Sequence, residues 1–139
     1  MLGRREAPEL APVRPGTVAL VAVGGALGAA ARYLVSVAMA SGSGFPWGTL
    51  LVNVLGAFAL AALMGAVVER RPTSLLRPFL GVGVLGGFTT FSTLSLEAIG
   101  LWNRGEHGLA AAYVCASVAG GLTAAAAGER LGRRSGGPA

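Results

Sequence analysis

The chain has 139 residues, of which 53% are hydrophobic and 12% are charged, and its mean hydropathy is +0.66. Soluble domains carry about 25% charged residues, so this composition indicates a membrane protein. The net charge of +5 results from 11 basic residues, all of them arginine, against six acidic residues. All of these arginines except Arg32 lie in short flanking segments without interleaved aromatic residues. That pattern disfavours nucleic-acid binding and favours anchoring of membrane helices at the lipid headgroups.

Two residues limit the metal and redox chemistry of the chain. A single cysteine, Cys115, excludes an intrachain disulfide and a cysteine-based zinc cluster. The only histidine, His107, lies in a short polar connector, where we expect a solvated side chain and not a metal ligand.

Four apolar segments are long enough to cross a bilayer, which takes about 20 residues. In chain order we expect a flexible cytoplasmic tail (1–16), a first span (17–40), a turn (41–45), a second span (47–68), a charged connector (69–78), a third span (79–101), a turn (103–108), a fourth span (109–128) and a basic cytoplasmic tail without secondary structure (129–139). Pro46 suits the start of the second helix. Residues 38–41 resemble a signal-peptide cleavage site, but the preceding segment is too long and contains Arg32. The sequence therefore predicts an all-α integral membrane protein with one small domain, 17–128.

Glycines recur at the spacing of closely packed membrane helices. Gly24 and Gly28 form one such pair, and Gly83 and Gly87 form another. Pairs of this kind let helix backbones approach closely. Because four helices of this length bury little of their own surface, we expect a dimer.

The arginines predict the orientation of the chain. Nine arginines fall in the two tails and the 69–78 connector, which four spans place on one side of the membrane, namely Arg4, Arg5, Arg14, Arg70, Arg71, Arg77, Arg130, Arg133 and Arg134. Arg104 alone falls on the other side. Because positive residues stay in the cytoplasm, both termini are predicted to be cytoplasmic.

Several polar residues interrupt the apolar spans. Arg32 lies in the first span, where an arginine is either functional or extends to the nearby interface. Asn53 lies in the second span and Glu97 in the third, whereas Tyr113 and Ser117 share one face of the fourth. Each of them, taken alone, is explained by an interhelical hydrogen bond.

The segment GGFTTFSTLS (86–95) combines two glycines with a cluster of hydroxyl groups, namely those of Thr89, Thr90, Ser92, Thr93 and Ser95. Hydroxyl groups donate hydrogen bonds without carrying charge and can replace part of the water around a small anion. A helix that breaks at Gly86–Gly87 would free carbonyl groups that suit a cation. The residues alone predict either a small-ion pathway or a polar helix interface.

Three segments, in order and at matching spacing, resemble the Fluc (CrcB) fluoride channels. They are GGALGAAARY (24–33), GTLLVNVLGAF (48–58) and GVLGGFTTFST (83–93), and the resemblance extends over about residues 17–128. It implies passive fluoride export that relieves fluoride toxicity. It also implies an inverted, antiparallel dimer with two pores near its interface and a third helix broken at its centre.

The resemblance also assigns roles to individual residues. A structural sodium ion at the dimer centre would bind the backbone carbonyls at Gly86 and Thr89. Phe91 would contact fluoride through its ring edge, which carries partial positive charge. Asn53 corresponds to an asparagine near the pore, and Arg32 to an arginine near the vestibule. A polar track corresponds to Ser92, Thr93, Glu97, Tyr113 and Ser117.

Two positions depart from the family pattern. Leu94 stands where a second pore phenylalanine is expected, and Gly121 stands where a further hydroxyl is expected one turn beyond Ser117. An inverted homodimer also needs chains that insert in both directions, whereas nine arginines against one favour a single orientation. We therefore hypothesise a heterodimer with a related, oppositely oriented subunit, although a homodimer is the alternative.

Other functions agree less well with the residues. A small multidrug exporter has a similar size but needs an acidic residue in the first span, where this chain has Arg32. A non-transporting structural subunit would use the hydroxyl groups only to join helices. No histidine or aspartate lies near a serine to activate it, so we predict that the chain is not an enzyme.

Overall fold

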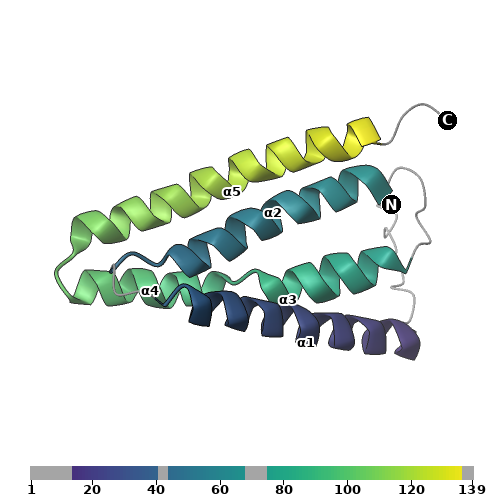
Figure 1. Cartoon of the computed structure of the whole chain (residues 1–139), viewed down its shortest axis with the longest axis horizontal. Coiled ribbons are helices and arrows are strands. Elements are labelled where there is room, and N and C mark those ends of the chain that lie inside the picture. Colours follow the sequence, from purple (N-terminus) through teal and green to yellow (C-terminus); the bar gives the residue numbers. More distant parts are fainter. Residues whose placement is uncertain (1–13, 41–43, 68–74, 136–139) are drawn as a thin grey trace, which may run out of the picture.

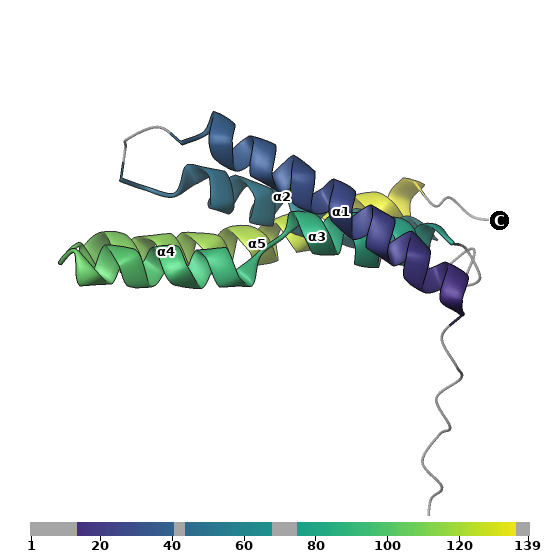
Figure 2. The ribbon, with the colours of Figure 1, turned by 90° about the horizontal axis from the view of Figure 1, so that it is seen from below.

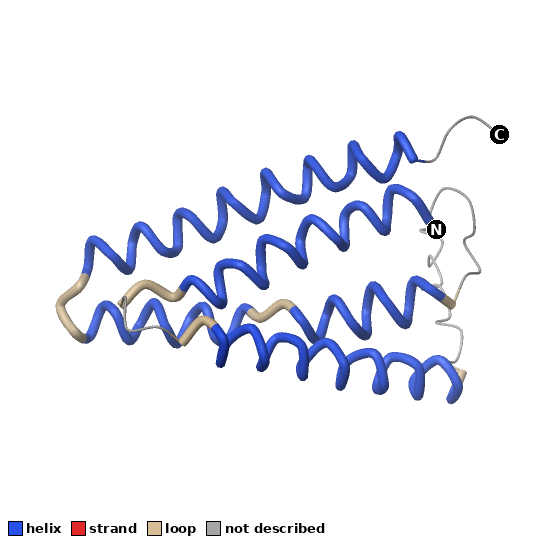
Figure 3. The backbone as a smooth tube through the Cα atoms, in the orientation of Figure 1, coloured by secondary structure: helices blue, strands red, loops and turns tan. Residues whose placement is uncertain are grey.

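The computed structural model describes residues 14–40, 44–67 and 75–135, and within these ranges every regular element is a helix (Figures 1 and 3). In chain order the elements are α1 (Pro15–Ala38), α2 (Trp47–Val67), η1 (Arg77–Leu85), α3 (Gly86–Phe88), α4 (Phe91–Asn103) and α5 (His107–Ser135). Four stretches of the described chain are long and apolar enough to cross a membrane: Pro15–Ala38, Trp47–Ala66, Arg77–Asn103 and His107–Arg134. The prediction of four membrane spans is confirmed.

The helix ends follow local sequence signals, with one departure from expectation. Pro15 lies in the first turn of α1, and Pro46 directly precedes α2, where proline is tolerated because its missing N–H has no helical partner. The prediction of an unstructured tail from residue 129 is wrong, because α5 continues to Ser135. An ion pair four residues apart, Glu129–Arg133, and two arginines in the last turn stabilise this extension. Most of the 1–16 tail, most of the 69–78 connector with Arg70 and Arg71, and residues 41–43 and 136–139 lie outside the described residues.

The third span is interrupted near its middle (Figure 3). η1 has π-helical hydrogen bonding, with wider turns than an α-helix. Gly86 itself keeps a right-handed helical backbone, with φ −65° and ψ −36°. The chain becomes extended at Thr89 (φ −79°, ψ 154°) and Thr90 (φ −150°, ψ 121°). The two glycines therefore precede the break and do not form it.

The helices pack as two close pairs that meet at the centre. α1 lies along η1 and α3, and α2 lies along α5 (Figure 1). The predicted glycine pairs make the first contact: a Cβ atom on Gly24 would lie 2.6 Å from the Phe79 carbonyl oxygen, and one on Gly83 would lie 3.0 Å from the Cα of Gly24. In Figure 2, α1 and α2 lie on one side of the bundle and α4 and α5 on the other, at the end that carries the 104–106 turn.

The two ends of the bundle differ in charge. The start of α1, the end of α2, the start of η1 and the end of α5 lie together at one end (Figure 1). Arg14, Arg77, Arg130, Arg133 and Arg134 belong to this terminal end. At the opposite end Arg104 forms an ion pair with Glu106 at 3.0 Å. The described residues therefore keep the charge asymmetry on which the predicted orientation rests.

Candidate functional site

Asn53 of α2 bridges the break in the third span. Its side-chain Nδ2 donates to the Thr90 carbonyl at 2.9 Å, and its Oδ1 accepts from the Thr90 backbone N–H at 2.8 Å. One amide side chain thus satisfies both backbone groups of an extended residue, which would otherwise lose its hydrogen bonds at membrane depth. Asn53, which is 37 positions from Thr90 in the sequence, thus stabilises the break.

Side chains also replace helical partners on either side of Thr90. Thr90 Oγ1 accepts from the Thr93 N–H at 3.1 Å and so caps the start of α4. In a continuous helix the N–H groups of Thr90 and Thr93 would reach the carbonyls of Gly86 and Thr89. Because side-chain oxygens take both N–H groups, the carbonyls of Gly86 and Thr89 lose these helical partners. The family resemblance implied cation binding at these same two carbonyls, which stays a prediction.

Arg32 contacts the break from α1. Its Nε donates to the Gly87 carbonyl at 3.2 Å, and its side chain is half-buried. An arginine at this depth is costly unless it is paired, and the carbonyl of an interrupted helix provides a partner. Arg32 therefore lies beside the centre of the third span.

Glu97 joins three helices near the end that carries the 104–106 turn. Its Oε1 accepts from Thr49 Oγ1 of α2 at 2.9 Å, and its Oε2 accepts from the Tyr113 hydroxyl of α5 at 2.6 Å. Tyr113 is fully buried, in a cluster with Leu101 and Ala110. Both carboxylate oxygens thus have hydroxyl donors, which offsets the cost of burying the group among apolar helices.

Ser117 lies one helical turn beyond Tyr113, about 6 Å along α5. The two side chains share the buried face of α5, as the sequence predicted, and Ser117 is 6% exposed. Within the described part of the chain the Ser117 hydroxyl has no hydrogen-bond partner. An unpaired buried hydroxyl costs about 1–3 kcal/mol.

Phe91 and Leu94 line a cavity of about 440 Å³ next to Ser117 and Asn53. Phe91 is 81% exposed, and it also borders a second cavity of about 320 Å³ with Thr89 and Thr90. Leu94 is partly buried and packs against the cluster around Tyr113. A third cavity, of about 270 Å³, contains Thr49 and Glu97 at the end that carries the 104–106 turn.

The other candidates are less closely grouped. Ser92 is exposed and lies 3.2 Å from Thr90 Oγ1, and Thr93 hydrogen-bonds Thr90. Ser95 donates to the Phe91 carbonyl of its own helix at 2.9 Å. A Cβ atom on Gly121 would meet no atom within 4 Å, so the space for the expected hydroxyl is open.

Sequence reasoning did not include Thr49 among the site residues. Thr49 and Asn53 are four residues apart, so they lie on the same face of α2, and this spacing was the signal that could have found Thr49.

His107 stacks on Trp102, with ring centroids 4.2 Å apart. Among the described residues no group of three or more histidine, cysteine or acidic side chains could hold a metal ion.

Comparison with known proteins identifies a family for this chain. A family model described as "CrcB-like protein, Camphor Resistance (CrcB)" matches residues 19–129. A relative from Agrobacterium fabrum is 50% identical over 119 residues, covering 84% of this chain and 95% of its own length. One from Cereibacter sphaeroides is 53% identical over 100 residues (70% and 79%), and one from Thermus thermophilus is 48% identical over 115 residues (81% and 91%).

Each of these relatives carries the name "Fluoride-specific ion channel FluC". The predicted resemblance is therefore confirmed, and with it the prediction of a channel family and not an enzyme. The four apolar helices and this family together identify a multi-pass membrane protein. This chain belongs to the CrcB-like family.

Proposed function

We propose that this chain is a subunit of a fluoride channel that lets fluoride leave the cell passively. Its membership of a family with relatives named as fluoride-specific channels supports this function. The observation that carries it is the unpaired, buried hydroxyl of Ser117 beside the Phe91 cavity. This hydroxyl can donate to a small anion without neutralising it and so without trapping it.

The proposed pathway follows the three cavities along α2, α4 and α5. Thr49 and Glu97 border one cavity, Ser117, Leu94 and Phe91 border the next, and Phe91 borders the last as well. Aromatic ring edges carry partial positive charge, so Phe91 supplies a second uncharged contact. Glu97 holds the hydroxyls of Thr49 and Tyr113 in fixed orientation and leaves Ser117 as the nearby donor.

The proposed pathway includes four further polar residues, namely Arg32, Asn53, Ser92 and Thr93. Asn53 borders two of the cavities and holds the break in shape. Ser92 is exposed on the single chain, so it would enter a pathway only where a partner subunit covers it. Arg32 adds a positive charge beside the break, which attracts anions toward the vestibule.

A structural sodium ion at the carbonyls of Gly86 and Thr89 is part of the proposal. Both carbonyls lose their helical N–H partners, and Gly86 is exposed on the single chain. Carbonyl oxygens suit hard cations, and two inverted subunits would bring four such groups together. When bound, the ion would supply positive charge between the carbonyl dipoles of the two subunits.

The proposed assembly is an inverted dimer, and we favour a heterodimer. The exposed Phe91 ring would then be covered by the partner subunit. The arginine asymmetry favours a single orientation with both termini in the cytoplasm, so the inverted position would need a different chain. That partner would provide the phenylalanine that Leu94 replaces and would give one complete pore.

Reconstitution tests both the function and the assembly. Two preparations are placed in liposomes: the purified chain alone, and the chain co-expressed with a related chain of reversed arginine bias. A fluoride electrode then measures fluoride efflux with and without sodium. We expect fluoride efflux without chloride efflux only for the pair. Absence of flux from the pair would favour a structural subunit, whereas sodium-dependent flux from a stable homodimer would exclude the heterodimer. A fluorescent reporter fused to the C-terminus should fluoresce if that terminus is cytoplasmic.

A further inference from the structure

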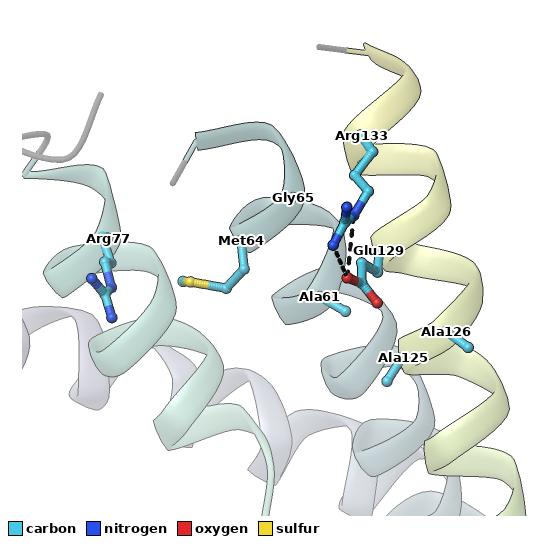
Figure 4. A pocket seen from close by; sticks show the side chains of 8 residues that line it. All are labelled: Ala61, Met64, Gly65, Arg77, Ala125, Ala126, Glu129 and Arg133. Atoms are coloured by element: carbon cyan, nitrogen blue, oxygen red, sulfur yellow. Dashed lines mark hydrogen bonds and ion pairs between the residues drawn. The ribbon is translucent and has the colours of Figure 1, made fainter. Parts of the chain in front are cut away.

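A fourth cavity, the terminal groove, lies among α2, η1 and α5 and has no role in the proposed pathway (Figure 4). Its volume is about 590 Å³. Its polar lining consists of Arg77 of η1 and Glu129 and Arg133 of α5. Its apolar lining consists of Ala61, Met64 and Gly65 of α2 and Ala125 and Ala126 of α5.

Polarity changes along the groove in the direction of the membrane normal. On α5 the lining runs from Ala125 and Ala126 through Glu129 to Arg133. Eight residues of α-helix separate Ala125 from Arg133, which is about 12 Å. With α5 crossing the bilayer, the arginines would lie near the headgroups and the alanines would lie deeper, at the level of the acyl chains.

Among the described residues, positive charges outnumber negative charges at the opening of the groove. Arg133 and Glu129 form an ion pair, with Arg133 Nη2 2.6 Å from Glu129 Oε1. Within the described chain Arg77 has neither a hydrogen bond nor an ion pair, and it lies on the other side of Met64 from that pair (Figure 4). Two further exposed arginines, Arg130 and Arg134, belong to the same end of α5. A negatively charged group at the opening would therefore be attracted.

We propose that the terminal groove binds an anionic phospholipid, with the headgroup phosphate at Arg77 and Arg133 and an acyl chain along Ala125, Ala126 and Met64. Basic pockets between membrane helices bind anionic lipid headgroups in this manner. A free phosphate ion would use the arginines but would leave the apolar lining unfilled. The combination of an unpaired guanidinium and an apolar groove that continues to greater depth fits a lipid.

Native mass spectrometry of the purified full-length protein tests this proposal with phosphatidylglycerol and phosphatidylcholine of identical acyl chains. We expect the wild type to retain phosphatidylglycerol preferentially. A basic residue near the membrane surface contributes about 1 kcal/mol to such binding, so Arg77→Gln should lower the affinity for phosphatidylglycerol about fivefold. Arg77→Lys should retain most of it. Arg104→Gln, at the opposite end and outside the groove, is the matched control and should change nothing.

Three outcomes would overturn the proposal. Equal loss of phosphatidylglycerol in Arg77→Gln and Arg104→Gln would indicate general surface charge. Displacement of the lipid by millimolar inorganic phosphate would indicate a site for free anions. Ala125→Phe fills the groove without changing charge, and it should reduce lipid binding. If it changes the oligomeric mass and leaves lipid binding unaltered, the groove is a subunit contact. Because lipid binding is measured directly, these outcomes are independent of fluoride flux.

Discussion

Substitution of Ser117 by alanine distinguishes two roles for its hydroxyl, namely binding of fluoride and an interhelical hydrogen bond. Ser117 is 6% exposed and its hydroxyl has no partner among the described residues. Removing an interhelical hydrogen bond would destabilise the fold by about 0.5–1.5 kcal/mol. Removing an unpaired buried hydroxyl should instead leave the stability unchanged or raise it, by at most about 1–3 kcal/mol.

The expected effect on transport is much larger than the effect on stability. A hydrogen bond to a charged group is worth about 1.5–3 kcal/mol. If fluoride uses Ser117 at the highest barrier along its path, losing that bond should slow efflux about ten- to hundredfold. Ser117→Ala should therefore reduce flux strongly in a protein that is at least as stable as the wild type.

Fluoride efflux from liposomes and the midpoint of detergent-induced unfolding provide the two measurements, made on the transport-competent assembly. Thr123→Ala is the matched control, because Thr123 lies on the same helix and is exposed, and its hydroxyl bonds only its own helix, at 2.8 Å to the Ala119 carbonyl. Normal flux in Ser117→Ala, or a loss of stability without a loss of flux, would refute the assignment of Ser117 to the pathway.

Three further substitutions test other parts of the structure. Asn53→Leu leaves both backbone groups of Thr90 without partners, so the free energy of unfolding in detergent should fall by at least about 2 kcal/mol and flux should be lost. Wild-type stability in this variant would contradict the bridging role of Asn53. Gly24→Ala places a methyl group 2.6 Å from a carbonyl oxygen of η1 and should destabilise the protein by about 1–3 kcal/mol. Gly25→Ala is the control, because its methyl group would lie 4.0 Å from the nearest atom and should be tolerated. Thermal unfolding measures both stabilities. Gly121→Ser enters open space, so it should leave stability unchanged, and an increase in fluoride efflux would identify the missing hydroxyl as part of the track.

Local sequence patterns anticipated much of the fold. Hydropathy predicted the four spans because lipid imposes one rule on every span, namely about 20 apolar residues with internally paired backbones. The glycine spacing in α1 and in the third span predicted close helix packing, and the structure adds that these two segments pack against each other at Gly24 and Gly83. The polar tail from residue 129 was misjudged, because the ion pair between Glu129 and Arg133 stabilises a helix that hydropathy does not detect.

The sequence by itself determined the membrane environment, the four spans and the family, because apolar length and ordered motifs are properties of contiguous residues. Only the tertiary structure decided where the third span breaks and which polar groups meet. The break follows the glycines because Asn53, distant in sequence, bonds Thr90. Thr49, Glu97 and Tyr113 meet because three helices converge. Ser117 is left as the unpaired donor by the same convergence. Such pairings depend on how the helices pack against one another, and no local sequence pattern determines which distant residues come into contact.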